Sequence, residues 1–346
     1  MNIRDAYYDN AKFLLIFLVV FGHFIQSFID ESKLIYTLYT TIYLFHMPAF
    51  ILISGYFARG FRKKGYLAKI TKKLIGPYLI FQGIYSIYYF VIRGWEPTEL
   101  DPLNPQWSLW FLVSLFFWNL MLFLFTKFKS SYAILISFGL GITVGYLDIV
   151  SNYLSLSRTI VFFPLFLLGY YFKKEHFETL RNKKVKLPAF VLLIIITAAF
   201  YILPEFDYKW LFGSKPYHAF DQTGLYGGIV RLGIYSLTLI ATFSFLALVP
   251  RKNLFFTKWG ASSIYIYLLH GFVVQYFRHS PFVEYVKDSE QIFVMLVVSM
   301  MITAICSSSW MKALAQPMIE LKFTTLRNMV LNTESKTQSS SYWNKG

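Results

Sequence analysis

The feature that most constrains this chain is its series of long apolar runs, separated by short polar segments. A helix needs about 20 apolar residues to cross the hydrocarbon core of a bilayer, and it satisfies its own backbone groups there. Charged residues make up only 15% of the chain, against about 25% in ordinary soluble domains. The sequence therefore predicts an all-α integral membrane protein, a bundle of about ten transmembrane helices. The expected spans are 11–29, 36–57, 74–92, 107–126, 131–147, 157–172, 186–203, 222–249, 260–278 and 291–311.

Most of the 33 lysine and arginine residues fall in alternate connecting segments, above all 58–73 and 173–186. Basic residues concentrate in cytoplasmic loops, so this alternation predicts that both the N- and C-termini are cytoplasmic. The same rule accounts for the net charge of +15, and no nucleic-acid partner is expected. The first apolar run is long and follows Asp5 and Asp9, which is untypical of a cleavable signal peptide.

No connecting segment is long enough for a separate folded domain. We expect one polytopic membrane domain over 1–313 and a cytoplasmic C-terminal tail over 314–346, disordered from about 332 where Ser, Thr and Lys dominate. A single cysteine, Cys306, excludes an intrachain disulfide framework and a cysteine-rich metal site. No phosphate-binding Walker loop, zinc-type His-Glu-x-x-His or Gly-x-Ser-x-Gly elbow is present, and no metal site is expected.

Lys12 and His23 are the first pair of residues that could carry chemistry. They are 11 residues apart on one expected helix, which places them on nearly the same face and roughly 16 Å apart along the axis. Asp9 joins the same stripe, and Gly22 would let another helix approach beside His23. The competing interpretation is a lysine that reaches the headgroups and a histidine bonded to a neighbouring helix.

His46 and Arg231 also stand inside apolar runs, and an ionisable residue within the membrane is a functional hypothesis by default. Ser54 follows His46 by two turns, toward the cytoplasmic side. His46 could instead bond a carbonyl freed by Pro48. Arg231 should face a polar cavity or an anion, unless its span begins later and the side chain reaches outward to the headgroups.

The segment 58–73 contains seven cations, which could bind phosphates beside a helix end. Membrane topology alone explains most of this charge, and anionic lipid headgroups are a further candidate partner. Two aromatic-rich stretches, 106–112 and 259–270, are interpreted as interfacial belts and core packing. The cations of the segment are Arg59, Arg62, Lys63, Lys64, Lys69, Lys72 and Lys73.

The stretch Asp9-Asn10-Ala11-Lys12, followed by Val19-Val20-Phe21-Gly22-His23, resembles the first helix of the membrane acyltransferase 3 family. That family's signature is a basic residue, ten residues, then histidine. The variant around Lys12 resembles the fucose 4-O-acetylase-like branch. Gly76 departs mildly from the pattern, in which an apolar residue usually precedes Pro-Tyr. Further fragments agree in family order, namely 45–48 with 54–56, 73–78, 109–112, and 260–264 with His270.

The resemblance implies an O-acyltransferase, usually an O-acetyltransferase, that moves an acyl group from acetyl-CoA or another acyl-CoA to a hydroxyl of a carbohydrate or cell-envelope glycan. It would be a multi-pass protein of the bacterial plasma membrane. His23 is expected to be the general base, because a neutral histidine in a desolvated site can accept the hydroxyl proton. His46 would be a second acid/base or orienting group. The resemblance and the residue pattern together assign CoA phosphates to Lys12, Arg59, Arg62, Lys63 and Lys64, and the substrate to Asp9, Ser54, Arg231 and His270.

A second class of function stays open, namely a secondary transporter or flippase for an anionic or sugar-linked lipid. Its polar pathway would use His23, His46 and Arg231. A membrane scaffold would explain the helices but not the stripe formed by Asp9, Lys12 and His23. Acetyl-CoA separates the first two classes, because only the enzyme should bind it and release free thiol when given an acceptor.

Overall fold

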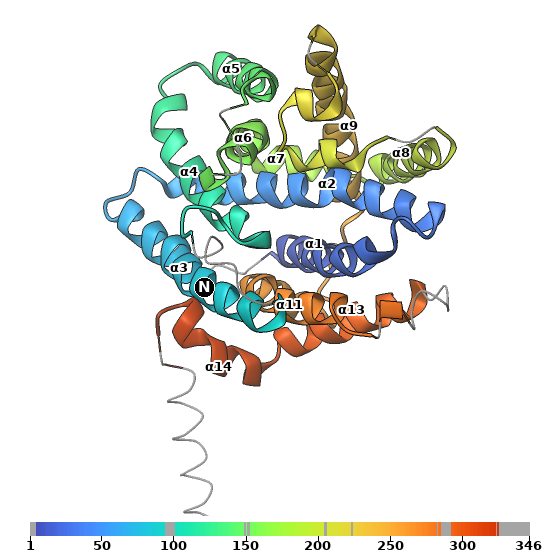
Figure 1. The fold of residues 1–346 in the computed structure, drawn as a ribbon. Coiled ribbons are helices and arrows are strands. Elements are labelled where there is room, and N and C mark those ends of the chain that lie inside the picture. The colour runs from blue at the N-terminus through green and yellow to red at the C-terminus, as the bar shows by residue number, and fades with distance from the viewer. Residues whose placement is uncertain are drawn as a thin grey trace, which may run out of the picture.

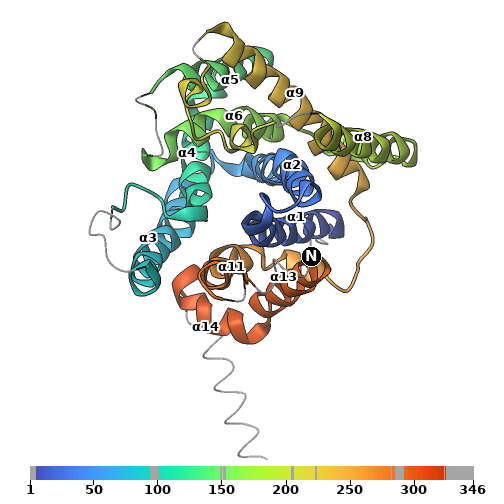
Figure 2. The same cartoon turned by 45° about the vertical axis from the view of Figure 1, so that its right-hand side comes forward.

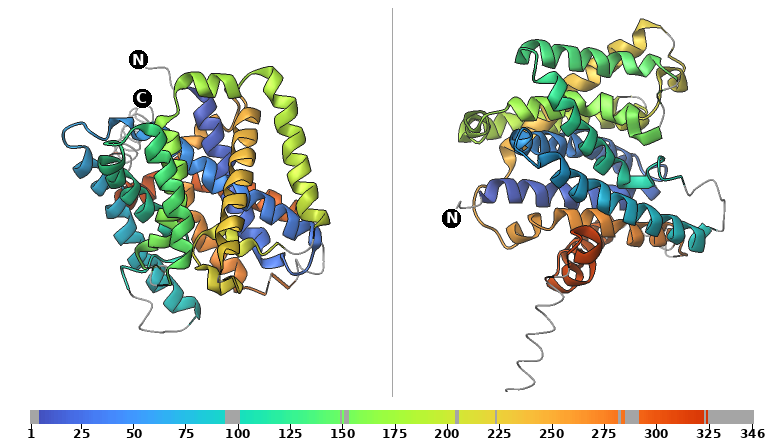
Figure 3. Two further views of the ribbon diagram at one scale, coloured as in Figure 1. Left: turned by 90° about the horizontal axis from the view of Figure 1, so that it is seen from above. Right: turned by 90° about the vertical axis from the view of Figure 1, so that its left-hand side faces the viewer.

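The computed structural model describes residues 5–93, 101–148, 150, 153–203, 206–222, 224–281, 283–284, 292–322 and 324. Regular structure in these residues is helical, and they contain no strand. The long helices run back and forth as a bundle, as the ribbon views show (Figure 1; Figure 3). They are α1 (Ala6–Ile25), α2 (Lys33–Phe57), α3 (Tyr66–Arg93), α4 (Trp110–Phe125), α5 (Ser130–Thr143), α6 (Leu156–Tyr171), α8 (Lys183–Ile202), α9 (Leu225–Leu248), α11 (Ser263–Arg278) and α13 (Ile292–Cys306). Shorter helices are α7 (Lys174–Leu180), α10 (Thr257–Gly260) and α14 (Ser309–Ile319).

Each expected span overlaps one of these long helices, but not all of the helices have the dimensions of a full span. Among the described residues, seven helices are long and apolar enough to cross a membrane, namely those that contain α1, α2, α3, α4, α6, α8 and α9. The bent pair α13 and α14 would make an eighth. The apolar helix at Ser130–Tyr146 is shorter, and α11 has 16 residues. The expectation of an all-α membrane protein is confirmed, whereas the count of ten spans and the placement of the termini remain predictions.

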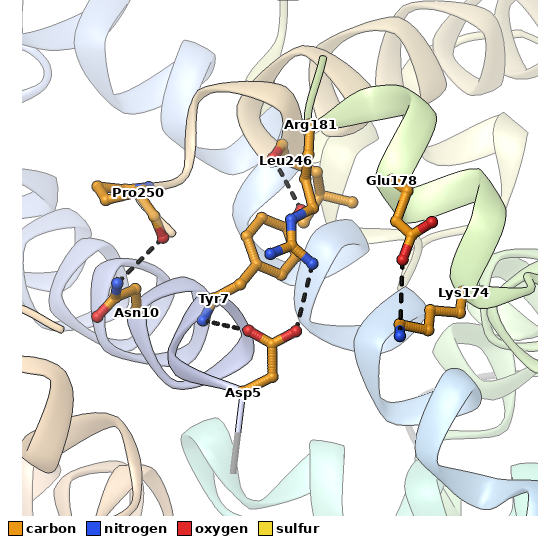
Figure 4. Close-up of polar contacts among 8 residues, drawn as sticks. All are labelled: Asp5, Tyr7, Asn10, Lys174, Glu178, Arg181, Leu246 and Pro250. Carbon is orange, nitrogen blue, oxygen red and sulfur yellow. Dashed lines mark hydrogen bonds and ion pairs between the residues drawn. The ribbon is translucent and has the colours of Figure 1, made fainter. Parts of the chain in front are cut away.

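Helix α1 lies inside the bundle, packed against α2, α11 and α13. Polar contacts link the N-terminal end of α1 to neighbouring segments (Figure 4). The carboxylate of Asp5 accepts a hydrogen bond from the backbone N–H of Tyr7 at 3.0 Å and forms an ion pair with Arg181 at 3.2 Å. The Tyr7 hydroxyl donates to the carbonyl of Leu246 at 2.8 Å. Capping of this kind satisfies donors that a helix start leaves open, so it fixes where α1 begins.

Helices α2 and α6 approach each other closely through two glycines. A Cβ added to Gly55 would lie 2.0 Å from the carbonyl oxygen of Phe166, and one added to Gly169 would lie 2.0 Å from that of Leu52. Small residues allow this approach between membrane helices, where packing rather than hydrophobic burial drives association. A larger residue at either position would separate α2 from α6, and α2 carries His46.

Helix α8 lies at the outside of the bundle (Figure 2). Its apolar window has a mean hydropathy of 2.3, but only 11% of it is buried by the rest of the chain. Leu187 and Ile195 are 70% and 56% exposed. An apolar helix left uncovered by protein is explained by contact with lipid. The outer surface of the molecule thus supports a position within the bilayer.

The expected loop 58–73 is shorter than the sequence indicated. Helix α3 begins at Tyr66, so Lys69, Lys72 and Lys73 lie on its first turns. The edge of an apolar run marks where a helix becomes hydrophobic, and lysine is a good helix former that extends the helix beyond that edge.

The last expected span, 291–311, is broken in the structure. Helix α13 ends at Cys306, and α14 leaves it at an angle of 66° (Figure 1). The hydroxyl of Ser308 accepts from the backbone N–H of Met311 at 3.2 Å, which caps a new helix instead of continuing the old one. The expected domain boundary at 313 falls within α14, and the tail expected to be disordered from 332 lies outside the described residues.

Candidate functional site

Three helices bring three histidines together. His23 lies in the last turn of α1, His46 in the middle of α2 and His270 in the middle of α11. The ring centroids of His23 and His270 are 5.6 Å apart. Tyr43 lies between His23 and His46. Its hydroxyl is 3.1 Å from Nδ1 of His23, and its ring centroid is 4.6 Å from that of His46. The structure therefore gathers the histidines that the sequence singled out on separate helices. Gly22 lies beside this contact, and a Cβ there would lie 3.1 Å from the Tyr43 ring.

Two of these histidines have a defined orientation. Nδ1 of His46 lies 2.7 Å from the carbonyl oxygen of Ile42, and Nδ1 of His270 lies 2.9 Å from that of Ile266. A carbonyl only accepts hydrogen bonds, so Nδ1 carries the proton and Nε2 of the neutral ring is an acceptor. His46 and His270 are 2% and 0% exposed, and Nε2 of His270 has no hydrogen-bond partner in the described part of the chain. His46 thus bonds the carbonyl of Ile42 rather than that of Leu44, which Pro48 leaves without its helical donor, and its other ring nitrogen can accept a proton.

Trp107, which lies just before α4, packs against His23 and His270. Its ring centroid lies 4.4 Å from that of His23 and 5.1 Å from that of His270. Its φ of 43° is in the left-handed region, which a bulky residue rarely adopts. A Cβ on Gly271 would lie 2.3 Å from the Trp107 ring, so only glycine leaves room for it there. Strained backbone of this kind persists where packing enforces it and is frequent at functional sites.

His23 and His46 line a cavity of about 170 Å³, which we call the histidine cavity, whereas His270 lies behind its wall against His23. Its walls are largely aromatic, and its polar groups include Gln26 and Arg158. Arg278 approaches from α11 and donates to the carbonyl of His23 at 2.7 Å and to the side-chain oxygen of Gln26 at 2.6 Å. The residues lining the cavity are Val19, His23, Gln26, Tyr43, His46, Met47, Trp107, Ser108, Trp110, Arg158, Phe162, Leu211, Phe212 and Tyr267.

A larger cavity of about 450 Å³ lies beside Lys12, and we call it the lysine cavity. Lys12 and Lys73 line it, from α1 and α3. Lys12 also forms an ion pair with Asp9 at 3.4 Å, which keeps the two members of the sequence stripe together. Ser54 lines the cavity as well, although its hydroxyl donates to the carbonyl of Phe50 at 2.8 Å. Most of the remaining wall is aliphatic or aromatic.

The two cavities adjoin. Val19, Met47 and Tyr267 line both of them, so the wall of one is continuous with the wall of the other. The Tyr267 hydroxyl donates to the carbonyl of Ser108, which holds this side chain at the junction. The stripe from Lys12 to His23 that the sequence indicated thus extends from one cavity to the other along α1.

The predicted phosphate-binding cations of the loop before α3 are near the lysine cavity but do not line it. The guanidinium of Arg59 lies over the ring of Tyr56 at 4.4 Å. Arg62 donates to the hydroxyl of Thr126 at 3.0 Å on the surface, and Lys63 and Lys64 are exposed. The chain at both ends of the loop does reach the cavity, through Ala58 and Tyr66.

Arg231 borders a third, much smaller cavity, which shares Tyr43, Phe162 and Leu211 with the histidine cavity. It is 3% exposed, its Nη1 donates to the carbonyl of Trp210 at 2.9 Å, and its guanidinium lies 5.6 Å from the centre of the Trp210 ring. It lines neither the histidine cavity nor the lysine cavity. The sequence correctly indicated that Arg231 is deeply buried, but the structure does not bring it to the histidines.

Sequence reasoning missed Arg158 and Arg278, which were interpreted as loop charges because each lies near a helix end. Lys73 was among the seven cations that could bind phosphates but was not assigned to CoA, and Trp107 was interpreted only as part of an aromatic belt or core packing. The one available signal was Arg278, which ends the expected span that carries His270. Within the described ranges, no three His, Cys, Asp or Glu side chains are arranged to hold a metal ion.

Comparison with known proteins identifies the family of the chain. The family model described as an acyltransferase domain matches residues 5–312, which include both cavities. Nodulation protein NolL of Mesorhizobium japonicum is 31% identical over 124 residues, 32% of this chain and 33% of the relative. NolL of Sinorhizobium fredii is 45% identical over 62 residues, 17% of each chain, so the similarity spans a third or less of these relatives. No solved structure matches. Because the family model covers nearly all of the membrane helices, this chain belongs to the membrane acyltransferase 3 family.

Proposed function

We propose that the chain is an O-acetyltransferase that moves an acetyl group from acetyl-CoA to a hydroxyl of a carbohydrate or cell-envelope glycan. The observation that carries this proposal is the junction between the two cavities at Val19, Met47 and Tyr267. A transfer between two substrates needs two sites whose reacting ends meet in a fixed geometry. The resemblance of the segment around Lys12 to the fucose 4-O-acetylase-like branch favours acetyl as the group and a sugar as the acceptor.

The lysine cavity suits the donor. Lys12 and Lys73 would bind CoA phosphates, since lysine is a common point-charge partner of phosphate. The cations from Arg59 to Lys64 would raise the local concentration of the anionic donor from outside the cavity. Asp9 would keep Lys12 oriented, and Ser54 would border the path of the acyl chain toward Met47. The thioester would then lie at the junction.

The histidine cavity suits the acceptor and the chemistry. In this proposal Nδ1–H of His23 donates to Tyr43, which leaves Nε2 to accept the proton of the acceptor hydroxyl. The hydroxyl oxygen attacks the thioester carbonyl carbon and forms a tetrahedral intermediate. The carbon–sulfur bond then breaks, and the histidinium returns the proton to the CoA sulfur. His46 lines the same cavity and would orient the hydroxyl, while His270 would support the His23 ring from behind the cavity wall.

The proposed orientation places the lysine cavity at the cytoplasmic face of a bacterial plasma membrane, where acetyl-CoA is made. Labelling with a membrane-impermeant thiol reagent tests it in a Cys306→Ser background. A cysteine introduced in place of Lys64 should be labelled only after the membrane is opened. Labelling of that cysteine in intact cells would contradict the orientation.

The experiment that tests the function uses the full chain in lipid nanodiscs. Acetyl-CoA binding is measured by calorimetry, and free CoA thiol is measured after addition of a cell-envelope glycan extract. We expect saturable binding, and thiol release that depends on the extract. A transporter or flippase would show neither, so absence of both results would reject the enzyme.

A further inference from the structure

Arg158 is a polar side chain of the histidine cavity for which the reaction outlined above has no use. It lies in the first turn of α6, and its guanidinium sits over the ring of Trp110 at 5.1 Å. In the part of the chain that the structure describes, it forms no hydrogen bond or ion pair. No aspartate or glutamate lines the cavity. A cation therefore borders a site that contains no anion.

The other arginines inside the bundle show what is unusual about Arg158. Arg231 donates to a backbone carbonyl, and Arg278 donates to a carbonyl and a glutamine oxygen. Arg158 is half-buried and faces a cavity within the bundle, and ionisable residues in this setting are costly and mark substrate pathways. The uncompensated guanidinium of Arg158 is therefore suited to an anion that arrives with a ligand.

The remainder of the cavity wall fits a sugar. Trp107, Trp110, Tyr43 and Phe212 contribute flat aromatic surfaces, while Gln26 and the histidines contribute hydrogen-bonding groups. Ligand sites commonly combine apolar and aromatic walls with a few placed polar groups. A sugar ring presents both kinds of surface, apolar C–H faces and a rim of hydroxyls. Trp110 serves two purposes here, since it borders the cavity and supports the guanidinium of Arg158.

We propose that the acceptor is an anionic sugar, bearing a carboxylate or a phosphate, and that Arg158 binds this group. The inference rests on the proposed function, because it names the substrate class of the same site. A guanidinium can hold either anion through two parallel hydrogen bonds, which also fixes the orientation of the bound group. The anionic substituent is held on the Arg158 wall while a hydroxyl of the same sugar faces His23.

The charge of the product tests this inference on the natural acceptor. Membranes from cells that encode the chain, and from a deletion strain, are supplied with acetyl-CoA labelled in the acetyl group. Base-labile label that depends on the chain is isolated and separated by anion exchange. We expect the labelled sugar to be retained. Carbodiimide-mediated reduction would abolish retention by a carboxylate, and phosphate hydrolysis would abolish retention by a phosphate. A neutral product overturns the inference, whereas no chain-dependent label overturns the proposed function itself.

Substitution separates binding of the acceptor from a role in the chemical step. In Arg158→Gln we expect the KM for the acceptor to rise roughly ten- to hundredfold, as for removal of a hydrogen bond to a charged group, with little change in acetyl-CoA affinity or in kcat at saturation. Arg158→Lys should recover part of the affinity because it keeps the charge but not the paired donors. Arg231→Gln is the matched control, because it is another arginine over a tryptophan ring, and it should keep the wild-type KM. A loss confined to kcat would overturn the inference and assign Arg158 to the transition-state oxyanion.

Discussion

The two cavities share three wall residues but differ in nearly everything else. The lysine cavity is large, has two lysines on its wall and is otherwise mostly apolar. The histidine cavity is less than half as large, is lined mainly by aromatic rings, and contains two histidines and an arginine. One suits a long anionic molecule with a slender apolar arm, and the other suits a compact ligand with a hydroxyl to deprotonate.

In the proposed function, donor and acceptor recognition are therefore separable. The residues proposed to hold phosphates lie at one end of α1, and those proposed to move a proton lie at the other. A substitution at one end should change one kinetic constant without the other, and a substitution at the junction should change neither affinity.

The largest expected effect is at His23. His23→Ala should lower kcat by roughly two to four orders of magnitude, the usual contribution of general acid–base catalysis. Acetyl-CoA affinity should hardly change, because the proposed phosphate site is at the far end of α1. His23→Gln should fail almost as badly, since an amide keeps a hydrogen bond but cannot accept and return a proton. Thiol release and calorimetry measure the two constants.

The outcome that would remove His23 from the mechanism is a well-folded His23→Gln protein with near-wild-type turnover. The base would then be sought at His46 or His270, whose Nδ1–H groups are already bonded to backbone carbonyls. His46→Gln is expected to cause only a partial loss of activity if His46 orients the acceptor. His46→Ala should be worse, because it also removes packing against Tyr43.

A second prediction concerns the junction. Met47→Trp should fill the space where the thioester and the hydroxyl would meet, and thereby displace the reacting atoms. A misplacement of about 1 Å can lower a rate on the order of 10²-fold, and we expect a decrease of that size in kcat. Acetyl-CoA should still bind. Met47→Leu conserves volume and should remain within a few-fold of wild type. If Met47→Trp transfers acetyl at the normal rate, the cavities do not form one reaction path.

A third prediction tests the donor end. Lys12→Gln combined with Lys73→Gln should weaken acetyl-CoA binding, by about 1.5–3 kcal/mol for each phosphate group that a lysine no longer holds. Neutralising Arg62, Lys63 and Lys64 together is the comparison, because these cations lie outside the cavity. This triple change should raise the Kd less, and its effect should disappear at high salt, as expected for screened attraction. Equal effects of both sets would show that the cavity lysines have no special role.

The helices and the histidines could be predicted from the sequence for the same physical reason. A lipid-facing helix must be apolar over its length, so each span is visible as a run, and a histidine inside such a run is conspicuous. His23 and His46 were identified in this way, whereas His270 was identified only through the family resemblance. Their convergence depends on how α1, α2 and α11 pack, for which the single chain offered only Gly22 as a local sign.

For charged residues near helix ends, the sequence did not show which ones face a cavity and which ones lie on the surface. Arg158 at the cavity, Lys73 at its wall and Lys64 on the surface look alike in a topology count, because each follows or precedes an apolar run. Only the packing of α6 against α4 places Arg158 over Trp110. Arg231 is the converse case. It lies deep in an apolar run and was therefore a candidate, but it lines neither the lysine cavity nor the histidine cavity.

The smallest expected effect is therefore at Arg231, and it is the most direct test of where the site ends. Arg231→Met should leave kcat and both affinities within about twofold of wild type, because the side chain lines neither cavity. Stability should change modestly. Removing a buried charge is often neutral, while the Trp210 carbonyl loses its donor, at a cost of about 1–3 kcal/mol. Thermal unfolding in nanodiscs and thiol release measure the two effects. A large loss of transfer with normal stability would extend the site across α9 and revive the polar pathway of a transporter, in which Arg231 is an essential member.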